Sequence, residues 1–246
     1  MLIADLLPPP VAAWESFRDH PEFVPHPAEA LSLRSSAPGR RRQFANGRYC
    51  AHRALQRLGT PAAPIPAGER GAPGWPPSVV GSITHCRGYT AAAVARRGEV
   101  LALGIDAEPH LPLDADVLEF VAGPEERTLV AELLARRPAV RWDRLLFSAK
   151  ESVYKAWFPA TGLFLGFLQA RVRFDPSAGT FRADVPGAVR AGARPPGGTP
   201  LPTRLTGRWQ VSDGVVVTAV AVQPTEAETT PAAAPAAPAS PEGERE

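Results

Sequence analysis

Lysine is almost absent from this chain. Of its 27 basic side chains only two are lysines, Lys150 and Lys155, and both lie in one short segment. A composition biased towards arginine explains the scarcity but does not explain the pairing. Because an ammonium is a compact point charge and a guanidinium is a wide planar fork, the pairing indicates either a site that requires an ammonium or chance.

Cysteine is scarce too, and targeting segments are missing. Cys50 and Cys86 have no neighbouring Cys or His at the spacing of a zinc site. The N-terminus lacks a basic and then apolar leader, and no apolar run reaches the length of a membrane span. A net charge of +2 is too small to indicate nucleic-acid binding. We therefore expect a cytoplasmic protein with neither membranes nor nucleic acids among its partners.

Several segments of the chain carry the apolar period of a helix or of a strand. The predicted helices cover residues 38–58, 114–122, 125–136 and 141–157, and Pro159 is expected to end the last of them. The predicted strands cover residues 79–84, 89–95, 100–106, 170–175, 180–185, 207–211 and 215–222. Stretches rich in Pro and Gly at residues 60–77 and 191–203 are expected to be loops.

The order of these elements divides the chain into two comparable parts. Each part combines helices with antiparallel strands, which is typical of an α+β fold. We place an N-terminal half at residues 1–108 and a C-terminal half at residues 109–223. Residues 224–246 are rich in Ala, Pro and Glu and have no apolar period, so this tail is expected to be disordered.

Two acidic residues stand at the end of the third predicted strand. Because side chains alternate along a strand, Asp106 and Glu108 share one face and Ala107 points away. Two carboxylates on one face repel each other unless a cation lies between them. Mg²⁺ takes oxygen ligands and leaves positions for water and substrate phosphate. The alternative is a pair of solvated carboxylates at the end of a strand.

The helix predicted at residues 141–157 carries both lysines. Glu151 and Lys155 are four residues apart, so they are neighbours on one helix face. An ordinary surface ion pair of this kind contributes roughly a few tenths of a kcal/mol. The concentration of both lysines in this segment favours a functional role.

Further polar side chains come earlier in the chain. Arg40 and Arg48 lie near the start of a predicted helix, where the dipole favours anions and arginine suits phosphate geometry. Thr84 and His85 end the first predicted strand and can donate to a phosphate. The alternatives are a solvated basic face and a structural histidine. No glycine-rich loop of Walker or Rossmann type accompanies these residues.

Taken in order, these segments resemble the phosphopantetheinyl transferases of the surfactin-synthetase and enterobactin-synthetase type. A basic RRxxFxxGR segment precedes Trp75-Pro76 and GSITHC, which are followed by GIDAE and FSAKESVYK. The resemblance covers roughly residues 35–175, and its GSITHC form is closer to the enterobactin-like branch. It implies a monomer of two similar α+β halves related by pseudo-two-fold symmetry, with coenzyme A and Mg²⁺ in the cleft between them.

The resemblance also implies roles for particular residues. Asp106, Glu108 and Glu151 would bind the metal, and Lys155 would contact the coenzyme A phosphates with Lys150 nearby. Coenzyme A would be bound by Arg40, Arg48, Arg70, Gly71, Ala72, Pro73, Thr84, His85, Asp106, Glu151 and Lys155. Ala107 stands where many relatives carry isoleucine, and its side chain should point away from the metal.

The implied reaction moves the 4′-phosphopantetheine group of coenzyme A to a serine of an apo acyl or peptidyl carrier protein and releases 3′,5′-ADP. Lys155 and Mg²⁺ would stabilise the negative charge of the phosphates. Glu151 would accept the serine proton, either directly or through a metal-bound water. Two alternatives stay open. A Mg²⁺-dependent nucleotide phosphohydrolase would use the carboxylate pair and the arginines, whereas a non-catalytic coenzyme A-binding module would keep the arginines and His85 but would not need Glu151 and Lys155.

Contacts with the carrier protein are harder to assign from the sequence. Arg171 and Arg173 on a later strand are compatible with steering an acidic carrier. Phe164 and Phe167, which follow the main helix, are candidates for an exposed apolar contact. Packing in the core is the alternative for both phenylalanines.

Overall fold

The computed structural model describes residues 1–33, 36–185 and 201–224. Most of the loop predicted at 191–203 and nearly all of the predicted disordered tail lie outside these residues. In chain order the elements are η1 (Ala4–Leu6), β1 (Ala12–Ser16), α1 (Pro27–Ala30), η2 (Leu31–Leu33), α2 (Pro38–Arg57), η3 (Glu69–Gly71), β2 (Val79–Cys86), β3 (Tyr89–Arg96), β4 (Ala102–Pro109), α3 (Ala115–Val121), α4 (Pro124–Arg136), α5 (Trp142–Thr161), η4 (Phe167–Gln169), β5 (Arg171–Asp175), β6 (Thr180–Asp184), β7 (Arg204–Ser212) and β8 (Val215–Val222).

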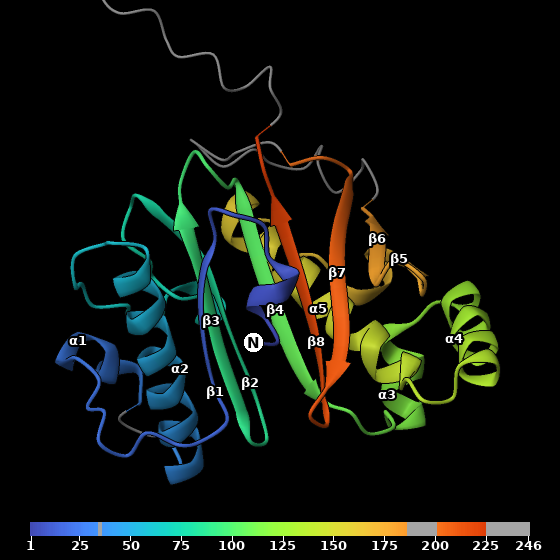
Figure 1. Cartoon of the computed structure of the whole chain (residues 1–246), viewed down its shortest axis with the longest axis horizontal. Coiled ribbons are helices and arrows are strands. Elements are labelled where there is room, and N and C mark those ends of the chain that lie inside the picture. Colours follow the sequence, from blue (N-terminus) through green and yellow to red (C-terminus); the bar gives the residue numbers. More distant parts are fainter. Residues whose placement is uncertain (34–35, 186–200, 225–246) are drawn as a thin grey trace, which may run out of the picture.

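The strands form two antiparallel sheets, which confirms the predicted α+β class. One sheet has the order β1-β3-β2 and the other has the order β4-β8-β7-β6-β5. Helix α2 packs against the smaller sheet, and α5 packs against β4 and β8 of the larger sheet (Figure 1). Strand β4 pairs with β8, which lies beyond the predicted boundary at residue 108. That boundary and the pseudo-two-fold symmetry stay predictions.

Strands β2 and β4 lie side by side where the two sheets meet (Figure 1). Here the two strands are joined by hydrogen bonds from backbone amides of β4 to side-chain hydroxyl groups of β2. Ser82 Oγ accepts a hydrogen bond from the Ile105 amide at 3.1 Å, and Thr84 Oγ1 accepts one from the Ala107 amide at 2.9 Å. Both bonds span 23 residues, so the two strands run in the same direction. These bonds satisfy buried amides of β4 and join the sheets.

Three apolar clusters hold the two sheets and the helices together. One lies between α2 and the smaller sheet, and a second lies between α3, α4, α5 and the larger sheet. In the third cluster, Leu2 and Ile3 of the N-terminal segment cover Ile105 and residues of both sheets. Val216 belongs to the second cluster and Val217 to the third. Because neighbouring residues of a strand face opposite ways, these two clusters lie on opposite faces of the larger sheet.

Helix α5 continues past Pro159 to Thr161, so the prediction that Pro159 ends it is wrong. A proline in the last turn removes only one helical hydrogen bond, and the turns before it are held by buried packing. The helix stops at Gly162, which has a φ of 69° and donates its amide to the Phe158 carbonyl at 2.8 Å. Glycine adopts this left-handed conformation without steric cost.

The other predicted elements are present with bounds shifted by a few residues, and one strand is new. Strand β1 pairs with β3 but has the sequence AAWES, which shows little of the alternation that marks a strand. The loop predicted at 60–77 contains only the short η3. Cys50 and Cys86 are both free. None of the helices within the described ranges is both long and apolar enough to cross a membrane.

Helix α5 packs directly on the backbone of β4 at Gly104. A Cβ atom there would lie 1.9 Å from the Ser152 carbonyl oxygen. Gly104→Ala should therefore push the helix away from the strand and lower the free energy of unfolding by about 1–3 kcal/mol, as measured by urea denaturation. Gly39→Ala, which meets open space in α2, is the control and should not lower stability. Equal stability of both variants would contradict the close packing.

Candidate active site

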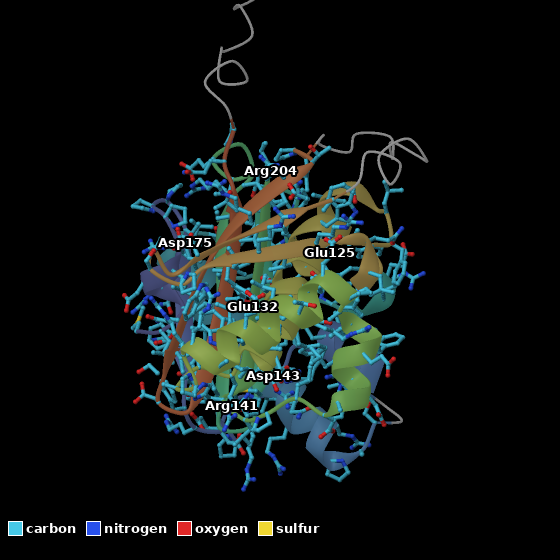
Figure 2. The ribbon with its side chains drawn as sticks, turned by 90° about the vertical axis from the view of Figure 1, so that its right-hand side faces the viewer. Glu125, Glu132, Arg141, Asp143, Asp175 and Arg204 are labelled. Carbon is cyan, nitrogen blue, oxygen red and sulfur yellow. The ribbon has the colours of Figure 1, made fainter. Side chains whose placement is uncertain are left out.

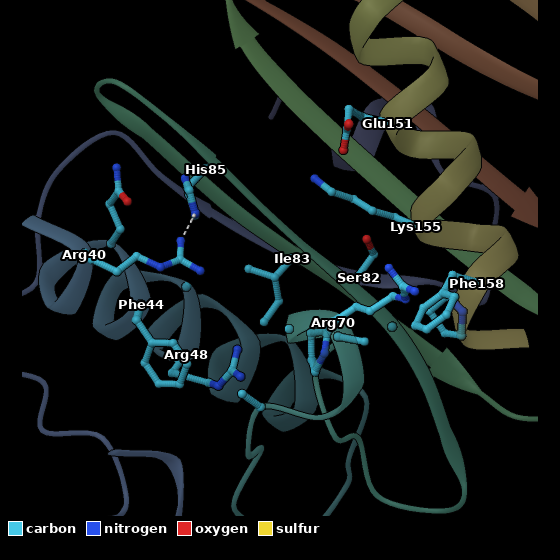
Figure 3. A pocket seen from close by; sticks show the side chains of 18 of the residues that line it. Arg40, Phe44, Arg48, Arg70, Ser82, Ile83, His85, Glu151, Lys155 and Phe158 are labelled. Carbon is cyan, nitrogen blue, oxygen red and sulfur yellow. Dashed lines mark hydrogen bonds between the residues drawn. The ribbon is translucent and has the colours of Figure 1, made fainter. Parts of the chain in front are cut away.

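A cleft of about 450 Å³ lies between α2 and α5, with β2 at its base (Figure 3). Arg40, Phe44 and Arg48 reach it from α2, whereas Glu151 and Lys155 reach it from α5 (Figure 3). Most of the predicted site residues line this cleft, namely Arg40, Arg48, Arg70, Gly71, Ala72, Pro73, His85, Glu151 and Lys155. The structure thus brings together residues that are more than a hundred positions apart in the sequence.

Positive charge dominates the lining of the cleft. Arg48 is buried, and its guanidinium lies 4.2 Å from the centroid of the Phe44 ring. Burial lowers the pKa of Arg48 to about 10, an effect that nearby Arg40 increases and Glu29 opposes. Its Nε atom has no hydrogen-bond partner. A buried cation with an unused donor is suited to an anionic ligand.

Arg70 closes the cleft from the loop between α2 and β2. It adopts a φ of 52°, a left-handed conformation that is uncommon for a residue with a side chain. Its guanidinium lies 5.1 Å from the centroid of the Phe164 ring and 6.0 Å from that of Phe158. The loop of the N-terminal part therefore contacts the end of α5 across the cleft.

His85 is held in its neutral form at the α2 side of the cleft. Arg40 Nη1 donates to His85 Nε2 over 3.4 Å, so this ring nitrogen acts as an acceptor (Figure 3). Burial, followed by the charges of Lys155 and Arg40, lowers the pKa of His85. Arg40 rather than the imidazole therefore carries the positive charge here at neutral pH.

Asp106 lies below the cleft and connects three elements. Lys155 Nζ donates to Asp106 Oδ1 at 2.7 Å, and Thr84 Oγ1 lies 3.3 Å from the same oxygen. Asp106 is only 4% exposed, and its Oδ2 atom has no hydrogen-bond partner. An unpaired buried carboxylate oxygen is costly, and it is the kind of ligand that a cation would satisfy. Thr84 and Asp106 thus support Lys155 from behind the cleft.

Glu108 and Glu151 share the electrostatic surroundings of Asp106. Burial and then the charge of Asp106 raise the pKa of Glu151, while Lys155 lowers it. Burial and Asp106 likewise raise the pKa of Glu108 to about 7, against the opposing effect of Arg144. Both carboxyl groups therefore lie near enough to Asp106 for mutual repulsion to be felt.

The predicted metal ligands do not form a ready cluster. In the described part of the chain no group of three or more His, Cys, Asp or Glu side chains is placed to hold a metal ion. Instead, Asp106 is paired with Lys155, and Glu108 is paired with Arg144 at 3.1 Å. The donor set nevertheless fits Mg²⁺, because it consists of oxygen ligands that repel each other and includes the unpaired Oδ2 of Asp106.

Lys150 does not line the cleft, so the structure does not support the prediction that it lies near the phosphates. Its ammonium is buried and donates to Glu126 Oε2 at 2.7 Å, to the Val121 carbonyl at 2.8 Å and to the Phe167 carbonyl at 2.7 Å. These three bonds use all of its donors and tie together α3, α4 and η4. Of the two lysines, Lys155 lines the cleft, whereas Lys150 is buried and stabilises the packing of α5 against α3, α4 and η4.

Sequence reasoning missed several residues of the cleft. No individual role is predicted from the sequence for Phe44, Ile83, Tyr154 or Phe158, yet all four line the cleft. The signal was the helical spacing: Tyr154 and Phe158 follow Glu151 by three and seven residues and share its face. These side chains provide apolar walls for the flat or hydrocarbon parts of a ligand.

The candidates for carrier contact lie on different surfaces. Phe164 is 58% exposed, but Phe167 stacks on Phe147 with ring centroids 5.7 Å apart. Phe167 therefore packs against other side chains, whereas Phe164 is available for an exposed apolar contact. Arg171 and Arg173 are exposed on β5, the edge strand of the larger sheet. Contact between any of these residues and a carrier stays a prediction.

A cleft lined by several cations and by aromatic side chains, above a buried carboxylate, suits a phosphorylated, nucleotide-like ligand. Comparison with known proteins agrees with this class of ligand. The model of the 4′-phosphopantetheinyl transferase N-terminal domain matches residues 27–95, and that of the 4′-phosphopantetheinyl transferase superfamily matches residues 102–191. The chain belongs to the 4′-phosphopantetheinyl transferase family and is a transferase enzyme.

Individual relatives support the assignment over most of the chain. The chain is 50% identical to 4′-phosphopantetheinyl transferase Svp of Streptomyces mobaraensis, over 90% of the chain and 89% of that protein. It is 42% identical to 4′-phosphopantetheinyl transferase PptT of Mycobacterium tuberculosis, over 89% and 97% respectively. It is 32% identical to enterobactin synthase component D of Salmonella typhimurium, over 64% of each.

The raised pKa of Glu151 predicts a gain in stability when its charge is removed. Because the folded state binds this proton more tightly than the unfolded chain does, the ionised carboxylate destabilises the fold at neutral pH. Glu151→Gln should raise the melting temperature at pH 7.5 in metal-free buffer. The gain should shrink as the pH falls towards the unperturbed pKa of 4.5, where both states become protonated.

Thermal melts from pH 4 to pH 8 test this expectation. Glu119→Gln, on the exposed surface of α3, is the control and should change the melting temperature little at any pH. A melting temperature of Glu151→Gln below that of the wild type at pH 7.5 would show that contacts with Lys155 outweigh the burial of the charge.

Proposed function

We propose that this chain transfers the 4′-phosphopantetheine group of coenzyme A to a serine of an apo acyl or peptidyl carrier protein. The reaction depends on Mg²⁺ and releases 3′,5′-ADP. The observation that carries the proposal is that Glu151 and Lys155 line an arginine-rich cleft, while Lys155 is bonded to the buried Asp106 below it. The names of the relatives support the same chemistry, since Svp and PptT are both called 4′-phosphopantetheinyl transferases.

Coenzyme A suits the cleft in size and in charge. A volume of about 450 Å³ is within the usual range for small-molecule sites. Arg40 and Arg48 bind phosphate oxygens on the α2 side, with the neutral His85 beside them, and Lys155 binds phosphate on the α5 side. Residues 70–73 border the nucleotide, and Thr84 contributes by holding Asp106.

The residues of α5 account for the transfer step. The serine oxygen bonds to the β-phosphorus, the bond from that phosphorus to the bridging oxygen breaks, and 3′,5′-ADP leaves with the electron pair. Glu151 reaches the cleft from α5 beside Lys155 and accepts the serine proton. Lys155 stabilises the negative charge on the phosphates. Asp106, Glu108 and Glu151 would hold Mg²⁺, which would supply further positive charge beside the phosphates.

Mass spectrometry of a carrier protein tests the function. Incubation with coenzyme A, Mg²⁺ and an apo-carrier should raise the mass of the carrier by one phosphopantetheine group and release one 3′,5′-ADP. Glu151→Gln should abolish transfer and still bind coenzyme A, because the arginines of the cleft remain. Release of 3′,5′-ADP without a modified carrier would favour a phosphohydrolase, and binding without any reaction would favour a coenzyme A-binding module.

A substitution that keeps the charge of Lys155 tests the requirement for an ammonium. Lys155 Nζ lies 2.7 Å from Asp106 Oδ1 in a confined position that a planar guanidinium does not fill. Lys155→Arg should lower kcat by roughly 10²-fold, measured by release of 3′,5′-ADP at saturating carrier. Arg136→Lys on the exposed face of α4 is the control. A wild-type rate for Lys155→Arg would mean that any cation suffices at this position.

The carrier that is modified, together with the expected monomeric state and cytoplasmic location, stays a prediction. A panel of apo-carriers from fatty acid, polyketide and non-ribosomal peptide synthesis addresses the first point directly. The pathway depends on which of these carriers is modified fastest.

A further inference from the structure

Arg144 uses every nitrogen of its guanidinium group around the end of strand β4. Nη1 donates to Glu108 Oε2 at 3.1 Å, Nε donates to the Leu111 carbonyl at 3.2 Å, and Nη2 donates to the Pro112 carbonyl at 2.8 Å. Arg144 and Glu108 are 19% and 20% exposed. A side chain with this many bonds in a half-buried setting has one orientation, and it holds the Glu108 carboxylate in one orientation as well.

Neighbouring residues fasten the same turn to the start of α5. Asp143 Oδ2 accepts from the Leu113 amide at 2.8 Å, and His110 Nε2 accepts from the Arg141 amide at 3.0 Å. Figure 2 shows Asp143 and Arg141 together at this end of the molecule. The segment that follows Glu108 is therefore a rigid support.

The pairing joins the end of β4 to the first turn of α5. Gly104 of the strand meets Ser152 of the helix, and Asp106 meets Lys155. Glu108, two residues further along, meets Arg144 nearer the start of the helix. Glutamate has more rotatable bonds than aspartate, so its carboxylate needs a second group to keep it over the site.

We propose that Arg144 is a positioning residue that holds the Glu108 carboxylate for the divalent ion. The inference rests on the proposed function, because that function supplies the ion. Arg144 acts through Glu108 and touches neither coenzyme A nor the carrier in this role. The positive charge of Arg144 opposes a nearby cation, but groups that orient metal ligands typically change metal affinity by about 10–100-fold, so we expect orientation to prevail.

The three hydrogen bonds of Arg144 also require an arginine rather than a lysine at this position. The three nitrogens of Arg144 donate to three different acceptors, as the several donors of a guanidinium allow. A lysine can reach the carboxylate or the carbonyl oxygens but has a single nitrogen with which to do so. Arg144→Lys should therefore retain only part of the effect.

Direct measurement of metal binding tests the proposal. With Mn²⁺ as the probe and electron paramagnetic resonance or calorimetry as the readout, Arg144→Met should weaken binding by about 10-fold. Arg144→Lys should fall between that variant and the wild type. Binding of coenzyme A without metal should stay within twofold for both variants, which shows that the cleft is intact. Unchanged or tighter Mn²⁺ binding would overturn the proposal.

A matched control and a double substitution separate positioning from a general effect of charge. Arg204→Met removes an arginine from another carboxylate pair, with Asp184 at 2.7 Å, and should leave Mn²⁺ affinity unchanged. Figure 2 shows Arg204 at the opposite end of the molecule from Asp143. In a Glu108→Gln background, Arg144→Met should cause no further loss. A further loss of the same size would show that Arg144 does not act through Glu108.

The outcome is distinguishable from a failure of the proposed function. A protein that binds Mn²⁺ in an Arg144-dependent manner but does not modify carriers would retain the inference and lose the transferase assignment. If the protein modifies carriers but its Mn²⁺ affinity does not depend on Arg144, the transferase assignment stands and the inference about Arg144 fails. If Arg144→Met does not fold, Arg144→Lys carries the test, and its Mn²⁺ affinity must lie below that of the wild type.

Discussion

The cleft depends on how strand β4 is held. At one edge of β4, Ser82 and Thr84 of β2 accept hydrogen bonds from its backbone amides through their hydroxyl groups. Across one face of β4, helix α5 packs against the backbone of Gly104. The first contact joins the two sheets, and the second sets the distance of α5 from them. Because Asp106 lies on β4 between these contacts and Lys155 lies on α5, both constraints converge on the same ion pair.

This arrangement places charge where burial makes it unfavourable. Asp106 keeps an unpaired buried oxygen, and Glu108 and Glu151 have raised pKa values because they are buried beside it. Arg48 is a buried cation with an unused donor. Such groups destabilise the fold unless a ligand pairs with them, so the apolar clusters on both faces of the sheets must offset this cost. The same groups are pre-arranged for a phosphate and a cation.

Much of the fold could be predicted from the sequence because most helices and strands have a clear apolar period. Helix α5 places Trp142, Leu145 and Val153 on one buried face, and the predicted strands alternate or run through buried valines. Strand β1 could not be predicted, because its sequence AAWES has no clear alternation and forms a strand only by pairing with β3. The end of α5 was misplaced because tertiary packing outweighed the loss of one hydrogen bond at Pro159.

By itself the sequence determined the α+β class, the order of the motifs, and which side chains share a face, because these follow from periods of two and 3.6 residues. Only the tertiary structure decided what each face meets. Lys150 and Glu151 are adjacent in the chain, yet one is buried against Glu126 and the other lines the cleft, since successive residues point about 100° apart around a helix. The partnership of Glu108 with Arg144 has the same origin: it joins residues 36 positions apart, and no local pattern records it.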